Sequence, residues 1–248
     1  MEMETNAKEM HGKAARSGLR TPRAVIFDFD GVVADTEGLH FECFAGALAE
    51  EGIAITREDH DRLFLGINDR AGFAKAFEEA GRKLSPEACA SLIERKSRSY
   101  RRRMGEIRLF PGVARLLEGL AARVPLAIGS GGRAVEIDAV LRSNGVCRHF
   151  IAIVSADDVF RSKPQPDCFL RAMEALRERS PALGGRIEPA ECLVVEDAPP
   201  GIEAARAAGM PCLAVAHTFP SESLACADRV VGRLGDLIAE DLLAPFPD

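Results

Sequence analysis

Two aspartates lie two residues apart directly after a short apolar run. Segment 25–31 reads VIFDFDG, so Asp28 and Asp30 follow apolar residues and precede Gly31, at which the backbone can turn. Two carboxylates this close repel each other unless a cation lies between them or one is protonated. Mg²⁺ prefers carboxylate and carbonyl oxygens. The pair therefore predicts a magnesium site, and the alternative is a solvated acidic loop.

A second acidic pair follows another apolar run. Glu196 and Asp197 end the segment CLVVED at 192–197, and the APPG sequence after it predicts the start of a helix. Taken alone, such a pair more often caps a helix, and capping remains a partial explanation for Asp197. Together with Asp28 and Asp30, the pair supplies the remaining carboxylates that a magnesium site needs.

Two further segments predict phosphate binding. IGSGG at 128–132 ends an apolar run with Ser130 and exposed amides before a helix, and amide donors at a helix N-terminus favour an anion. SKPQPD at 162–167 places Lys163 in a loop stiffened by prolines, where an ammonium group could neutralise phosphate charge. An ordinary strand-to-helix turn and a surface lysine are the alternatives.

The elements that would position these side chains alternate along the chain. Short apolar runs without polar alternation are separated by amphipathic segments, which predicts an α/β fold with a Rossmann-like parallel sheet buried on both faces. The predicted strands span 24–29, 125–129, 151–155, 192–196 and 212–216. Helices are predicted over 133–143, 166–178 and 201–208.

One region carries only helical periodicity. Apolar residues at 39, 43, 44, 47 and 48 form one helical stripe, and helices are also predicted over 69–80 and 86–103. We therefore predict a flexible leader at 1–22, a core domain at 23–35 and 105–248, and an inserted all-helical cap domain at 36–104.

Bulk composition limits the partners. The formal net charge is -6, which provides no global positive field for nucleic acid or an anionic membrane. Seven cysteines without a Cys-x-x-Cys pair argue against a disulfide framework or zinc site and predict a cytoplasmic protein. The apolar runs are too short to cross a bilayer. We expect a small-molecule substrate and a monomer or small homo-oligomer.

Four ordered motifs resemble those of the haloacid dehalogenase-like superfamily. They are Asp28-x-Asp30-Gly31, Ser130, Lys163-Pro164 and Glu196-Asp197. The helical insertion resembles that family's C1-type cap. Segments 28–37 and 196–210 are most similar to the β-phosphoglucomutase/CbbY-like phosphatase branch.

The resemblance implies a mechanism that the residue types also support. Asp28 would attack phosphorus and form an aspartyl-phosphate, and Asp30 would act as acid and then base. Ser130 and Lys163 would hold the phosphoryl oxygens. The implied Mg²⁺ ligands are Asp28, the Asp30 backbone carbonyl and Asp197, with Glu196 close by or acting through water.

The insertion is where substrate choice is expected. Thr36 and His40 are four residues apart and share a helix face; the resembling mutases carry a hinge threonine and a histidine at these positions, and a cap lysine corresponding to Lys96. Segment 65–70 resembles the family's specificity loop, with its arginine, Arg70, displaced by one position. The candidate substrate-binding residues are Thr36, His40, Arg70, Lys96, Gly131 and Arg133.

The basic run at 95–103 predicts a solvated helix face. The alternative is that Lys96 and Arg103, seven residues apart, meet a second anionic group of the substrate.

Three functions follow. The first is a Mg²⁺-dependent phosphohydrolase for a small phosphorylated metabolite, most simply a sugar phosphate. The second is a β-phosphoglucomutase-type phosphomutase, which His40 and Lys96 favour; the displaced Arg70 and the absence of side chains at Gly131 and Gly132 favour the phosphatase. The third is a non-catalytic binding module, against which the intact acidic motifs argue.

Overall fold

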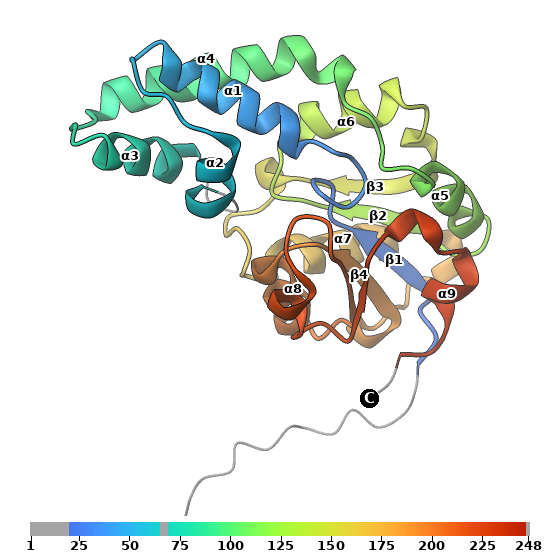
Figure 1. The fold of residues 1–248 in the computed structure, drawn as a ribbon. Helices are drawn as coiled ribbons and strands as arrows, with labels where there is room; N and C mark the ends of the chain where they lie inside the picture. The colour runs from blue at the N-terminus through green and yellow to red at the C-terminus, as the bar shows by residue number, and fades with distance from the viewer. Residues whose placement is uncertain (1–19, 65–68, 247–248) are drawn as a thin grey trace, which may run out of the picture.

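The computed structural model describes residues 20–64 and 69–246, and it shows a parallel sheet flanked by helices (Figure 1). The strands lie in the order β3-β2-β1-β4-β5-β6, and all neighbouring pairs are parallel. The strands are β1 (Ala24–Phe27), β2 (Leu126–Gly129), β3 (Phe150–Val154), β4 (Cys192–Glu196), β5 (Cys212–Val215) and β6 (Arg229–Val231). The predicted Rossmann-like α/β fold is confirmed.

Helices cover both faces of the sheet. On one face, Val25 and Phe27 of β1 share an apolar cluster with α5 (Val113–Ala121), α6 (Ala134–Ser143) and α9 (Ala239–Leu243). On the other face, Ala24 and Ile26 pack with α7 (Asp167–Arg179) and α8 (Pro199–Ala207). Burial on both faces explains why β1 is continuously apolar.

The remaining helices form a separate group above one end of the sheet (Figure 1). They are α1 (Glu37–Ala49), α2 (Arg57–Leu63), α3 (Asp69–Glu79) and α4 (Pro86–Arg103). These helices share an apolar cluster of their own, and Phe44, Phe73 and Leu92 are among its buried members. This arrangement supports the predicted division into core and cap, whose exact boundaries remain predictions.

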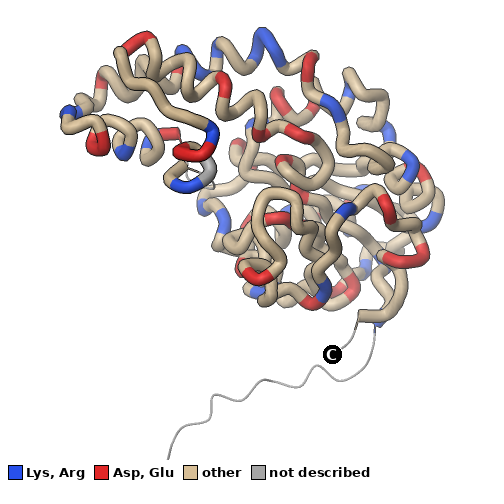
Figure 2. The backbone as a smooth tube through the Cα atoms, viewed as in Figure 1, with Lys and Arg blue, Asp and Glu red and all other residues tan. Residues whose placement is uncertain are grey.

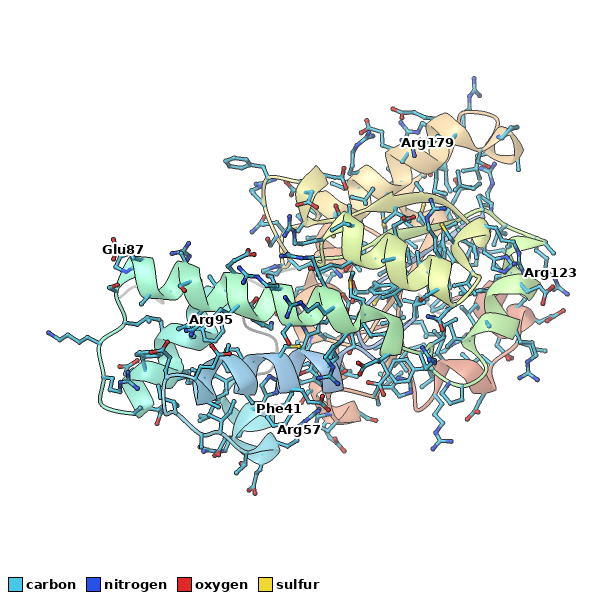
Figure 3. The ribbon with its side chains drawn as sticks, turned by 90° about the horizontal axis from the view of Figure 1, so that it is seen from above. Phe41, Arg57, Glu87, Arg95, Arg123 and Arg179 are labelled. Atoms are coloured by element: carbon cyan, nitrogen blue, oxygen red, sulfur yellow. The ribbon has the colours of Figure 1, made fainter. Side chains whose placement is uncertain are left out.

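Polar contacts join these four helices at their surface. Helices α1 and α4 run side by side in Figure 3, and Arg95 of α4 donates to Glu50 at 2.8 Å and to Glu51 at 2.5 Å. The guanidinium of Arg57 lies 5.5 Å from the centre of the Phe41 ring, which links α2 to α1. The helix group is therefore held by ion pairs and ring contacts as well as by its apolar centre.

The basic run of α4 is ion-paired along the helix. Lys and Arg are interspersed with Asp and Glu in this region (Figure 2). Arg101 lies 3.2 Å from Glu94, and Arg103 lies 2.7 Å from both Glu42 and Glu106. These pairs support the interpretation of the run as a solvated helix face.

Several predicted boundaries were wrong by one or two residues, and no range was predicted for helices α2, α5 and α9 or for strand β6. β1 ends at Phe27 because the chain turns after it, where the Val33 and Ala34 amides donate to the Phe29 carbonyl. Helix α2 starts with a capping box between Thr56 and Asp59. Single 3-10 turns occur at Met104–Glu106, Cys147–His149, Ala156–Asp158, Pro181–Leu183, Pro189–Glu191, Ser221–Leu224 and Leu234–Asp236.

Residues 1–19 of the predicted leader and 65–68 of the predicted specificity loop lie outside the described residues. All seven cysteines are free thiols. Throughout the described ranges, every helix is too short or too polar to span a bilayer.

Candidate active site

Three strand ends bring the predicted motifs together. Asp28 directly follows β1, Glu196 ends the adjacent β4, and Ser130 directly follows β2 on the other side of β1. Strand order reverses direction at β1 and β4, and open α/β sheets bind ligands at the carboxyl ends of strands beside such a switch point. Residues far apart in sequence thus meet at one edge of the sheet.

Lys163 links the first and last motifs. Its Nζ donates to Asp28 Oδ1 at 2.7 Å and to Glu196 Oε1 at 2.6 Å. Burial alone would lower the pKa of this ammonium group, but the two carboxylates outweigh burial and raise it. Lys163 is therefore held as a cation.

The same surroundings favour the neutral form of the nucleophile candidate, Asp28. Burial, together with nearby Glu196 and Asp30, raises the pKa of Asp28 to about 7, although Lys163 acts in the opposite direction. A raised pKa means that the ionised carboxylate is poorly stabilised. Lys163 alone therefore supplies less positive charge than this buried group needs in order to ionise.

Glu196 has a structural task besides its contact with Lys163. Its second oxygen, Oε2, accepts from the backbone amides of Asp197 at 2.7 Å and Ala198 at 2.9 Å. The predicted capping role of Asp197 was therefore wrong: Glu196 binds the amides at the entrance to α8. Gly201 in the first turn of α8 lies so close that an added Cβ would overlap the Glu196 carboxylate.

The carboxylates of Asp28, Glu196 and Asp197 form a buried cluster. One oxygen of each lies within 4.8 Å of those of the others. Burial, with Glu196 and Asp28 nearby, raises the pKa of Asp197 well above its usual range. Three oxygen donors and a single lysine among the described residues of this cluster form a set that suits a hard divalent cation such as Mg²⁺.

The Asp30 carboxylate, predicted among the metal residues, lies outside this cluster and faces the helix group. It accepts from Thr36 Oγ1 at 2.6 Å, and His40 Nε2 lies 3.9 Å away. Burial alone would raise the pKa of Asp30, but His40 and the Thr36 hydroxyl outweigh burial and lower it. The Tyr100 ring stacks on His40 with centroids 4.4 Å apart. Only the Asp30 backbone carbonyl remains a candidate ligand.

The phosphate-binding candidates differ in their surroundings. Ser130 Oγ accepts from the Gly132 amide at 3.0 Å, which leaves its hydrogen available to a phosphoryl oxygen. The Lys163–Pro164 peptide is cis. Lys163 Nζ lies 4.7 Å from the centre of the Phe169 ring, a contact that no sequence motif indicated.

A cavity of about 400 Å³ opens beside Asp30, between the helix group and the core. Of the predicted substrate-binding residues, His40, Lys96, Gly131 and Arg133 line it. Thr36 is fully buried and contacts Asp30 instead.

Two predicted cations do not reach this cavity. Arg70 is exposed and lies outside the lining, and Arg103 is ion-paired on the surface of α4. The alternative of Lys96 and Arg103 meeting one anion was therefore wrong.

A loop after β5 adds a residue that no motif indicated. Thr218 Oγ1 donates to Asp197 Oδ2, and His217 Nδ1 lies 3.3 Å from the Gly31 carbonyl oxygen. Gly31 has φ +74°, and an added Cβ would overlap Asp197. Thr218 lies 21 residues after Asp197, and only the parallel pairing of β4 and β5 brings them together.

The sequence is similar to those of known proteins. The family described as haloacid dehalogenase-like hydrolase matches residues 25–215. Protein CbbY of Rhodobacter capsulatus is 32% identical over 196 residues, covering 76% of this chain and 82% of its own. Beta-phosphoglucomutase of Bacillus subtilis is 31% identical over 224 residues, covering 88% and 92%.

A solved structure shows the same fold. CbbY from Rhodobacter sphaeroides in complex with xylulose-(1,5)bisphosphate has a TM-score of 0.76 and 25% identity. The match covers 90% of this chain and 99% of that one.

Proposed function

The chain belongs to the haloacid dehalogenase-like hydrolase family, and on this premise we propose that it is a Mg²⁺-dependent phosphatase for a small phosphorylated sugar. The observation that carries the proposal is the contrast between two neighbouring aspartates. Asp28 is bound by Lys163 within the carboxylate cluster, whereas Asp30 contacts Thr36 and faces the cavity. Neighbouring carboxylates in different environments take different roles.

In the first step Asp28 attacks the phosphorus atom and forms a P–O bond to its carboxylate. The bond to the sugar oxygen breaks, and Asp30 gives a proton to that oxygen. Because His40 and Thr36 lower the pKa of Asp30 in the unliganded chain, Asp30 would take up this proton as the anionic phosphate ester binds beside it. In the second step Asp30 takes a proton from a water molecule as the water oxygen attacks phosphorus. Asp28 is released as a carboxylate together with inorganic phosphate.

The surrounding residues stabilise charge on the phosphoryl group. The Lys163 ammonium and the Ser130 hydroxyl would each donate to its oxygens. Asp28 and Asp197, with the Asp30 backbone carbonyl, would hold Mg²⁺, which supplies positive charge to the phosphoryl oxygens when bound. Glu196 would orient Lys163.

Metal removal tests the proposal directly. We expect phosphate release from p-nitrophenyl phosphate and from a panel of sugar phosphates to disappear after EDTA treatment and dialysis, and to return with Mg²⁺, because the buried carboxylates lack sufficient counter-charge without it. Full turnover in metal-free buffer would contradict the role of the metal. No phosphate release from any ester with Mg²⁺ present would contradict the proposed function.

Thr218→Val is expected to lower Mg²⁺ affinity about tenfold, the usual effect of losing a hydrogen bond to a ligating carboxylate. The substitution keeps the side-chain shape but removes the donor to Asp197. Isothermal titration with Mg²⁺ measures the change without turnover. Thr218→Ser, which retains the hydroxyl, is the control and should bind as the unmodified protein does. Equal affinity in all three proteins would rule out this positioning role.

A phosphomutase is the second candidate, favoured by the similarity to beta-phosphoglucomutase over 224 residues. In that reaction Asp30 would activate a sugar hydroxyl in place of water. Formation of glucose 6-phosphate from β-glucose 1-phosphate, primed by glucose 1,6-bisphosphate, would identify a mutase. Release of inorganic phosphate alone identifies the phosphatase.

A further inference from the structure

The cavity beside Asp30 is richer in carboxylates than in cations. Among the described residues that line it, Glu37, Asp69 and Glu136 add to Asp30. Lys96 and Arg133 are its lysine and arginine. The leaving group of the substrate would occupy this space, because Asp30 and the Ser130 loop form its core side.

Lys96 is already neutralised inside the cavity. Its side chain is 10% exposed, and its ammonium group forms an ion pair with Asp69 at the start of α3. A buried cation matched by a carboxylate provides little net attraction for a second anion, and a dianion placed there would also meet Asp69.

Arg133 adds little attraction for a second anionic group in the cavity. It is exposed at the residue that precedes α6, where solvent screens its charge. It also lies in the field of Glu136: burial raises the pKa of this carboxyl, while His40 and Arg133 act in the opposite direction. The lysine and the arginine among the described lining residues therefore each act on a carboxylate of the same cavity, as His40 does on Asp30.

The same lining suits a neutral polyhydroxylated group. Carboxylates only accept hydrogen bonds, and sugar hydroxyls are donors that they can bind without added charge. Tyr100, Phe44 and Phe64 supply ring surfaces for the apolar faces of a sugar.

We propose that the enzyme selects monophosphate esters of neutral polyols over bisphosphates, and that Asp69 determines this selectivity by holding Lys96. The inference rests on the proposed phosphatase function and names its substrate class. It also sets this chain apart from the related CbbY, whose complex contains a bisphosphate.

Two matched substrate pairs test the proposal: fructose 1-phosphate with fructose 1,6-bisphosphate, and glucose 1-phosphate with glucose 1,6-bisphosphate. Initial rates of phosphate release with Mg²⁺ give kcat/KM for each. We expect the full-length protein to favour a monophosphate over its bisphosphate by about tenfold or more, as repulsion by one unpaired charge would produce.

Asp69→Asn frees the charge of Lys96 and should reduce this preference about tenfold. Lys96→Met leaves Asp69 unpaired and should strengthen the preference, which gives a second measurement if Asp69→Asn fails to fold. Glu79→Gln is the matched control, because it removes one carboxylate from an exposed position of the same helix outside the cavity lining. Its preference should equal that of the unmodified protein.

The outcomes separate the two proposals. Equal or better turnover of a bisphosphate, or an unchanged preference in both Asp69→Asn and Lys96→Met, overturns the selectivity while the phosphatase stands. Turnover of p-nitrophenyl phosphate with none of the four sugar esters overturns the polyol class. Absence of phosphate release from every ester overturns the proposed function and, with it, this inference.

Discussion

Asp28→Asn is expected to reduce kcat for phosphate release by roughly 10⁴-fold or more, as loss of a covalent nucleophile does. The amide keeps the size of the carboxylate but cannot form the acyl phosphate. It also removes one negative charge from the crowded cluster of Asp28, Glu196 and Asp197, so the folded protein should not lose stability. The expected result is a folded but inactive protein.

The measurement combines steady-state kinetics with mass spectrometry of protein quenched in acid during turnover. A single added phosphoryl group should appear on the unmodified chain and be absent from Asp28→Asn. Asp35→Asn is the control: it makes the same change in the same connection between β1 and α1, but at an exposed carboxylate with no assigned role. If Asp28→Asn turns over like Asp35→Asn, the nucleophile assignment is wrong.

Lys163→Met is expected to have two effects. Turnover should fall roughly 10³-fold, because the transferred group loses a fixed cation. The free energy of unfolding of the metal-free protein should fall by about 3 kcal/mol, because Asp28 and Glu196 lose their buried counter-charge. Addition of Mg²⁺ should restore part of that stability, since a cation that binds only the folded chain stabilises it.

Urea unfolding with and without Mg²⁺ measures the second effect. Lys83→Met is the control, since it removes the same charge from an exposed loop position. Superimposable unfolding curves for Lys163→Met and Lys83→Met would show that the buried ion pairs contribute nothing measurable to stability.

The strands that are buried on both faces could be predicted, because their sequences are continuously apolar. β1 and β4 are fully buried, and their apolar runs stand out. β6 was missed because its three residues are half-buried at the sheet edge and one is Arg229. Helix α2 was missed because its sequence, REDHDRL, carries no apolar stripe, and the signal that starts it is the cap at Thr56.

The residues of the site could likewise be predicted where a local sequence motif contains them. Asp28, Ser130, Lys163 and Glu196 stand in local motifs, and the sheet order brings them together. The hydrogen bond of Thr218 to Asp197 depends on how a loop after a neighbouring strand folds back, which no local pattern encodes. The exposure of Arg70 and the pairing of Lys96 with Asp69 likewise depend on packing among helices distant in sequence.

The four helices α1 to α4 occupy one uninterrupted stretch between β1 and α5, and they have an apolar centre of their own. No strand of the sheet lies within the described part of that stretch. The residues proposed to select the substrate, Asp69 and Lys96, thus lie in a different portion of the gene from the catalytic motifs. Recombination at two points could exchange the selecting portion for that of a relative while every strand keeps its neighbours. New substrates would then be acquired by transplanting a module, without rebuilding the machinery that breaks the phosphate ester.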